Sequence, residues 1–165
     1  MNAAALRAWR NGFAPLLPTP GLERLAEALK NAPVREATGT PFGPLVQGVT
    51  VFPYASDFFT SGHGKPVEAC CAVTFTGWQS HEWTVKEASD YFANVCEQAD
   101  KALGEGGCRY FLNWFDDTPF EKVRAELGSE IERELRLRQG VLSAHPVAVP
   151  FPADPRSSIL GGGDK

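Results

Sequence analysis

Two adjacent acids, Asp116 and Asp117, are the residues whose type and spacing most directly suggest chemistry in this chain. A Mg²⁺ ion is typically held by one or two carboxylates together with water and a substrate phosphate. A site of this kind would serve a small metal-dependent hydrolase or phosphoryl-transfer enzyme, with Mg²⁺ as its cofactor. A further ligand or base would have to come from elsewhere. His81, Glu82 and Asp57 are candidates because they lie in predicted loops or near strand ends.

The same two acids also have a structural explanation. Residues 118–121 fit a capping box, in which Thr118 caps a helix, Pro119 takes the first helical position and Glu121 reaches back to the cap. Acids placed just before a helix are stabilised by its dipole, by about 0.3–1 kcal/mol each. Adjacent strand residues point to opposite faces, so the two carboxylates need not converge. We therefore favour two helix-entry acids over a catalytic pair.

Other catalytic patterns are weak. The Gly64-Lys65 pair resembles part of a phosphate-binding P-loop, but Phe59 and Pro66 occupy positions where that loop needs Gly and then Ser or Thr. The sequence has no Cys-x-x-Cys pair and no histidine pair at helical spacing, which argues against a structural zinc site. A Gly-x-Ser-x-Gly nucleophile elbow is also absent from the sequence.

The four cysteines are expected to be free thiols. A chain of this length with a hydrophobic core does not need disulfides. Cys70 and Cys71 are neighbours in a predicted strand, and Cys96 falls on the apolar stripe of a predicted helix. Buried free cysteines behave as small hydrophobes, and burial leaves a thiol unreactive. A catalytic pairing of one cysteine with a distant histidine stays open.

Composition limits the class of protein and its partners. The chain has 165 residues, of which 43% are hydrophobic and 22% charged, as in an ordinary globular domain. Its formal net charge of −4 argues against nucleic acid or an anionic membrane as the main partner. The sequence has no stretch near the roughly 20 continuous apolar residues of a transmembrane helix. Its N-terminal residues lack the features of a targeting peptide. We therefore expect a cytoplasmic protein.

Hydrophobic periodicity predicts alternating helices and strands. A capping box at Thr84–Glu87, followed by apolar residues at helical spacing, predicts a helix that ends at Gly104. Similar signals predict further helices over 3–10 and over 119–138, and a helix that Thr19 caps, that starts at Pro20 and that Pro33 ends. Strands are predicted over 46–52, 67–76 and 108–116, with a proline-limited edge strand over 145–151.

This order of elements predicts an α+β fold. We expect a two-layer sandwich, in which a three- to four-stranded mixed sheet carries helices mainly on one face. Residues 1–154 would form a single domain with a proline-rich helical segment at its N-terminus. The glycine-rich tail over 155–165 is expected to be disordered.

Aromatic residues in two predicted loops support a second functional hypothesis. Trp78 and Trp83 flank His81, and Tyr54 and Phe58 lie in a nearby loop. Such side chains either close the core or, if exposed, form a contact surface, because Trp and Tyr dominate binding hot spots. The hypothesis that we prefer is a non-enzymatic protein–protein interaction module, such as an adaptor, a regulator or an immunity-type protein. It needs no cofactor, and its partner is another protein.

Overall fold

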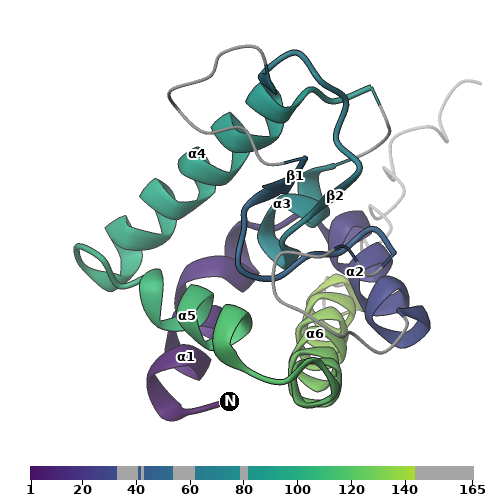
Figure 1. Ribbon diagram of the computed structural model, residues 1–165. Helices are drawn as coiled ribbons and strands as arrows, with labels where there is room; N and C mark the ends of the chain where they lie inside the picture. The colour runs from purple at the N-terminus through teal and green to yellow at the C-terminus, as the bar shows by residue number, and fades with distance from the viewer. Residues whose placement is uncertain (33–40, 42, 54–61, 79–81, 144–165) are drawn as a thin grey trace, which may run out of the picture.

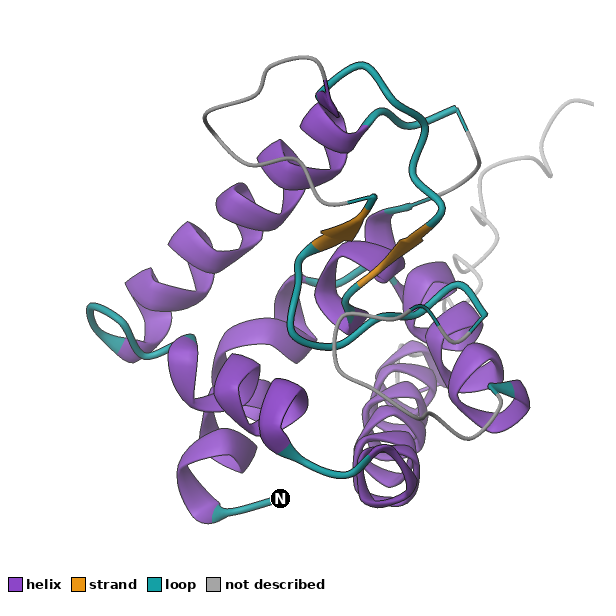
Figure 2. Ribbon diagram, viewed as in Figure 1, coloured by secondary structure: helices purple, strands orange, loops and turns teal. Residues whose placement is uncertain are grey.

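The protein folds mostly into helices, which surround one small antiparallel sheet in the part that the structure describes (Figures 1 and 2). The computed structural model describes residues 1–32, 41, 43–53, 62–78 and 82–143, with side chains as far as 140. Its elements are α1 (Ala3–Ala8), a π-helical turn (Trp9–Phe13), a 3-10 turn (Ala14–Leu16), α2 (Thr19–Asn31), β1 (Val51–Phe52), β2 (Ala69–Cys70), α3 (Ala72–Gly77), α4 (Val85–Leu103), α5 (Arg109–Asp117) and α6 (Phe120–Ser143).

The predicted α+β sandwich is therefore wrong. The sheet of the described residues has two strands of two residues each, paired in the register Val51 to Cys70 and Phe52 to Ala69. The strand predicted over 46–52 is reduced to its last two residues, because Gly48 adopts a positive φ of 82° and the chain bends there. Helices, not a sheet, supply most of the core.

The second half of the strand predicted over 67–76 belongs to helix α3. Its apolar residues on both faces suggested a central strand, but every residue of α3 is buried, so helical geometry satisfies the same pattern. A short apolar run cannot be assigned to a helix or a strand by periodicity alone. Within this predicted strand, β2 comprises Ala69 and Cys70, which pair with β1.

The strand predicted over 108–116 is also wrong, because these residues form α5. The buried residues of this helix are Phe111, Trp114 and Phe115, which follow helical spacing. The alternation that suggested a strand placed Tyr110 on the same face as Trp114, yet Tyr110 is 60% exposed. In a segment of nine residues, the apolar pattern is too short to distinguish helical spacing from the alternation of a strand.

The helices predicted from capping signals are confirmed. The backbone N–H of Thr84 donates to the Glu87 carboxylate at 2.8 Å, and the Thr84 hydroxyl accepts from the Glu87 N–H at 3.3 Å. Gly104 ends α4 with a φ of 93°. Helix α2 begins at Thr19 itself, one residue earlier than the predicted cap allows, and it buries the expected apolar face.

Helix α6 begins at Phe120 and runs to Ser143, five residues beyond its predicted end. The carbonyl of Pro119 accepts from the N–H groups of Lys122 and Val123, so the helix starts one residue later than the Thr118 capping box predicted. The predicted edge strand over 145–151 and the predicted tail over 155–165 lie outside the described residues.

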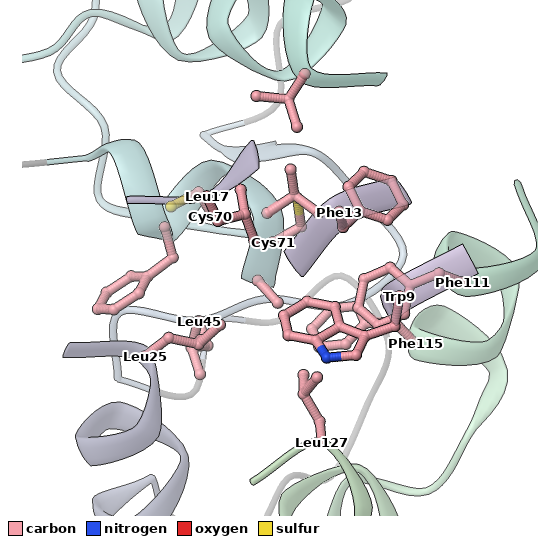
Figure 3. Close-up of a cluster of buried hydrophobic side chains, with 14 of the residues drawn as sticks. Trp9, Phe13, Leu17, Leu25, Leu45, Cys70, Cys71, Phe111, Phe115 and Leu127 are labelled. Carbon is pink, nitrogen blue, oxygen red and sulfur yellow. The ribbon is translucent and has the colours of Figure 1, made fainter. Parts of the chain in front are cut away.

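The centre of the core is a cluster of aromatic side chains from the N-terminal π-helical turn and from α5 (Figure 3). The Phe111 ring lies with its centroid 5.0 Å from that of Trp9 and 5.1 Å from that of Phe13. Trp9 and Phe13 are the first and last residues of the π-helical turn, and both side chains are buried. Leucines of α2 and α6, including Leu25 and Leu127, continue this core outward. None of the described helices is both long and apolar enough to cross a membrane.

Two arginines connect the first helices to α6. Arg10 forms a bidentate ion pair with Glu130, with both N···O distances at 2.7 Å. Arg138 donates to the carbonyls of Ala14 at 2.6 Å and Leu17 at 3.0 Å, and also to the Thr19 hydroxyl at 2.8 Å. The carbonyls at the start of the 3-10 turn and just after it therefore accept hydrogen bonds from Arg138 of α6.

The Arg10–Glu130 pair makes part of the stability dependent on pH. Hydrogen bonding to Arg10 lowers the pKa of Glu130 below its ordinary value of 4.5. A lowered pKa in the folded state stabilises the fold above the unfolded pKa, and this contribution is lost as the pH falls through the folded pKa. We expect Glu130→Gln to lower the melting temperature near neutral pH and to flatten its fall below pH 4.5. Thermal unfolding followed across acidic and neutral pH measures this slope.

The matched control is Glu121→Gln, because the Glu121 side chain is on the same helix but 59% exposed and only loosely paired with Arg124. Solvent screens exposed pairs, so this variant should keep the wild-type acid slope. An unchanged slope in Glu130→Gln would contradict a stabilising role for the Arg10–Glu130 pair.

Candidate functional site

The two aspartates occupy the last positions of α5 rather than the end of a strand. The Asp116 carboxylate is half-buried and accepts a hydrogen bond from the Gly48 N–H at 2.8 Å. Buried Gln47 donates to the carbonyls of Phe115 and of Thr118, the latter at 3.1 Å. These bonds satisfy carbonyls at the end of the helix and attach the neighbouring loop to it. Asp116 therefore has a structural role that the sequence did not indicate.

The residues that the structure describes do not form a set of ligands for the predicted Mg²⁺ ion. Among them, no group of three or more His, Cys, Asp or Glu side chains is placed to hold a metal ion. Asp117 is exposed, and adjacent helical positions diverge by about 100°, so it does not share a ligand position with Asp116. Of the further candidates, Glu82 is exposed, whereas His81 and Asp57 lie outside the described residues. The Mg²⁺ hypothesis therefore stays a prediction.

A small cavity of about 120 Å³ lies beside Asp116 and brings it near Cys71. The Cys71 thiol is buried and lies 3.3 Å from the Thr74 hydroxyl, and burial raises its pKa above the ordinary value of 9.0. A buried thiol with a raised pKa is a poor nucleophile. The predicted free state of the cysteines is confirmed for all four.

The residues predicted to form the binding surface differ in their burial, and three of them lie outside the described residues. Trp78 is 9% exposed and belongs to the core, where its ring lies edge-on to Phe75 with centroids 6.0 Å apart. Trp83 is half-buried and packs on the ring of Tyr91, with centroids 5.5 Å apart. The other predicted binding residues, Tyr54, Phe58 and His81, lie outside the described residues.

Trp83 and Tyr91 line a surface depression of about 300 Å³, which we call the aromatic groove. The 3-10 turn and the residue before α2 form one wall, and α4 with the end of α3 forms the other. Among the residues that the structure describes, those that line it are uncharged: Leu16, Pro18, Gly77, Trp83, Tyr91, Asn94, Val95 and Gln98. The groove is therefore an apolar site with neutral amides on one side.

Local contacts fix the two aromatic rings of the groove. The Trp83 carbonyl accepts from the Val67 N–H at 2.9 Å, directly before the capped start of α4. The Tyr91 hydroxyl lies 3.2 Å from the Thr76 hydroxyl, and burial raises the pKa of Tyr91, so the phenol stays neutral. Rings held in this way lose little conformational entropy when a ligand binds.

Gly77 allows the Tyr91 ring to lie against the backbone of α3. A Cβ atom at position 77 would lie 2.4 to 2.6 Å from three atoms of that ring. We expect Gly77→Ala to displace Tyr91, deform the aromatic groove and lower the free energy of unfolding by about 1–2 kcal/mol. Chemical denaturation measures the change in stability. The fluorescence of Trp83, which contacts Tyr91, should change as well.

Gly128→Ala in α6 is the control for this variant. A Cβ atom at position 128 would meet nothing within 4 Å, so alanine should raise stability by about 0.5–1 kcal/mol through its better helix propensity. Equal gains in both variants would show that Tyr91 is not held against Gly77.

The sequence marks Trp83 as a candidate binding residue but not the other residues of the groove. Tyr91 is one of the apolar residues at helical spacing in α4, and no local pattern indicates that Leu16 or Pro18 is its neighbour. These residues meet only through tertiary packing. Comparison of the chain with protein-family models, curated proteins and solved structures finds no match. The chemistry of the aromatic groove itself is therefore the basis for a functional assignment.

Proposed function

We propose that this protein is a non-enzymatic protein–protein interaction module, whose aromatic groove binds an extended segment rich in proline and aliphatic residues. The observation that carries this proposal is the pairing of Trp83 with Tyr91 in an uncharged surface depression. Grooves lined by aromatic rings bind proline-rich segments, because the rings pack flat against pyrrolidine rings. Such segments are extended beforehand and lose little entropy on binding.

The amides at the edge of the groove suit a peptide ligand. Asn94 and Gln98 are exposed and hydrogen-bonded to each other at 2.5 Å on successive turns of α4. A side-chain amide both donates and accepts hydrogen bonds, so the pair can exchange its mutual bond for bonds to peptide groups of a ligand. The apolar floor would then supply affinity, and the amides would fix the direction of the segment.

The uncharged lining and the net charge of −4 favour a protein partner over nucleic acid. We also propose a cytoplasmic location, because its four free cysteines suit a reducing compartment. A groove of about 300 Å³ holds only a few side chains, so we expect a transient complex with an affinity in the micromolar range.

Trp83→Ala is expected to weaken partner binding at least tenfold without unfolding the protein, because Trp83 is half-buried at the groove surface. Tagged wild type and variant are used to capture proteins from the native host, and each captured protein is quantified by mass spectrometry. A specific partner must be less abundant among the proteins captured by Trp83→Ala than among those captured by wild type. Its proline-rich segment, made as a peptide, must then bind the purified wild type.

Tyr110→Ala is the matched control, because it removes an aromatic residue that is 60% exposed and outside the groove. Gln98→Lys provides a second test, since it places a charge at the groove edge on an exposed position and should leave folding intact. Equal capture of the partner by wild type, Trp83→Ala and Gln98→Lys would exclude the groove as its binding site.

A further inference from the structure

The C-terminal part of α6 lies next to the aromatic groove. Arg138 binds the Leu17 carbonyl at 3.0 Å and the Thr19 hydroxyl at 2.8 Å, and these residues alternate with Leu16 and Pro18 of the groove wall. Figure 1 shows that α2 and α6 lie side by side, and an ion pair between Lys30 and Glu132 at 3.2 Å joins them farther along. The chain therefore leaves α6 near one end of the groove.

The chain that follows α6 has the length and composition to fill the groove. Helix α6 ends at Ser143, and residues 144–156 have the sequence AHPVAVPFPADPR, with prolines at positions 146, 150, 152 and 155. At about 3.1 Å per residue, a dozen extended residues span roughly 37 Å. Arg138, which binds Leu17 and Thr19, lies five residues before the end of α6, about 7.5 Å along the helix, so a dozen extended residues are long enough to reach the groove wall.

The chemistry of this segment matches that of the groove. Residues 146–153 carry no charged side chain, and the described residues that line the groove carry none either. Val and Ala lie between Pro146 and Pro150, and Phe151 lies between Pro150 and Pro152. Proline rings and small aliphatic side chains are the groups that aromatic grooves accept.

We propose that residues 145–155 of this chain bind the aromatic groove of the same molecule and block it until a partner displaces them. The inference rests on the proposed function, because it requires that the groove bind extended segments. A short flexible tether gives an effective concentration of about 1 mM. If the free segment binds with a dissociation constant of about 0.1 mM, its own groove is about 90% occupied. An external ligand then binds about tenfold more weakly than to an open groove.

The experiment uses the full chain and a fluorescent peptide of residues 144–156 as the probe. One variant carries Pro146→Ser, Pro150→Ser, Pro152→Ser and Pro155→Ser, which should release the segment. We expect this variant to bind the peptide about tenfold more tightly than wild type. Adding Trp83→Ala should abolish the gain. A control chain carries Ile159→Ser and Leu160→Ser, outside the segment, and should behave as wild type.

Equal peptide affinity for wild type and the proline variant would overturn self-occlusion, because the groove would then be open in both. No binding of the peptide to either chain would overturn it as well. Neither result affects the proposed function, whose test is the loss of the partner in Trp83→Ala. A photo-cross-linker in place of Phe151 should join residues of the groove within one chain. Cross-linked products with twice the mass of the chain would instead show that the segment occupies a second copy.

Discussion

Phe111→Ala is expected to lower the free energy of unfolding by about 3–5 kcal/mol. The Phe111 side chain is fully buried and touches four other aromatic rings, those of Trp9, Phe13, Trp114 and Phe115, with centroids between 5.0 and 6.3 Å away. Alanine would leave a cavity between the first helix and α5, which the rigid neighbouring rings cannot fill. Urea denaturation of both proteins measures the loss.

Tyr110→Ala completes this test, because Tyr110 is the neighbour of Phe111 on α5 and is 60% exposed. An exposed substitution should change stability by no more than about 0.5 kcal/mol. A strand over 108–116 would place Tyr110 on the same face as Trp114 and would predict a large loss for Tyr110→Ala. The pair of variants therefore distinguishes helix from strand, and a larger loss for Tyr110→Ala would contradict the helix.

Gly21→Ala is expected to cost about 3 kcal/mol, the second largest effect. A Cβ atom at position 21 would lie 2.1 Å from the carbonyl oxygen of Thr76 and 2.8 Å from its carbonyl carbon. This contact differs from that of Gly77 with Tyr91, because a backbone cannot move aside as a side chain can. Helix α2 must then separate from α3, and the hydrogen bond from Arg24 to the Thr76 carbonyl, at 3.3 Å, would be lost as well.

Differential scanning calorimetry of Gly21→Ala, with Gly140→Ala as the control, measures this cost. A Cβ atom at position 140 of α6 would meet nothing within 4 Å, so the control should match or slightly exceed wild type in melting temperature. A melting temperature for Gly21→Ala equal to that of the control would mean that α2 and α3 are not in close contact.

The sequence predicted elements whose ends carry a local signal. Helix α4 was predicted correctly because Thr84, Glu87 and Gly104 act on backbone groups within one turn of themselves. The strand predicted over 67–76 was wrong for α3, although β2 within it is a strand, because the residues of α3 are all buried and burial alone does not distinguish a helix from a strand. Only the surrounding tertiary structure decides between them.

The candidate site could likewise be predicted from the sequence only in part. Trp83 could be singled out by residue type, and its exposure on the structure is consistent with a contact surface. Tyr91 is eight residues away, and Leu16 and Pro18 come from a different part of the chain. Asp116 was conspicuous in sequence, but its bond to Gly48 depends on a loop 68 residues away. Contacts between distant segments carry no local sequence signal.

The bonds of Arg10 and Arg138 to the opposite end of the chain also bear on the rate of folding. Their partners are between 119 and 124 residues away in sequence. Helical proteins usually fold within milliseconds because most of their contacts are local, and distant contacts slow folding. During synthesis the apolar faces of the first 31 residues are covered completely only after α3, α4, α5 and α6 have all been made. We therefore expect this protein to fold more slowly than its helix content suggests, and its nascent N-terminal segment to be a natural substrate for chaperones.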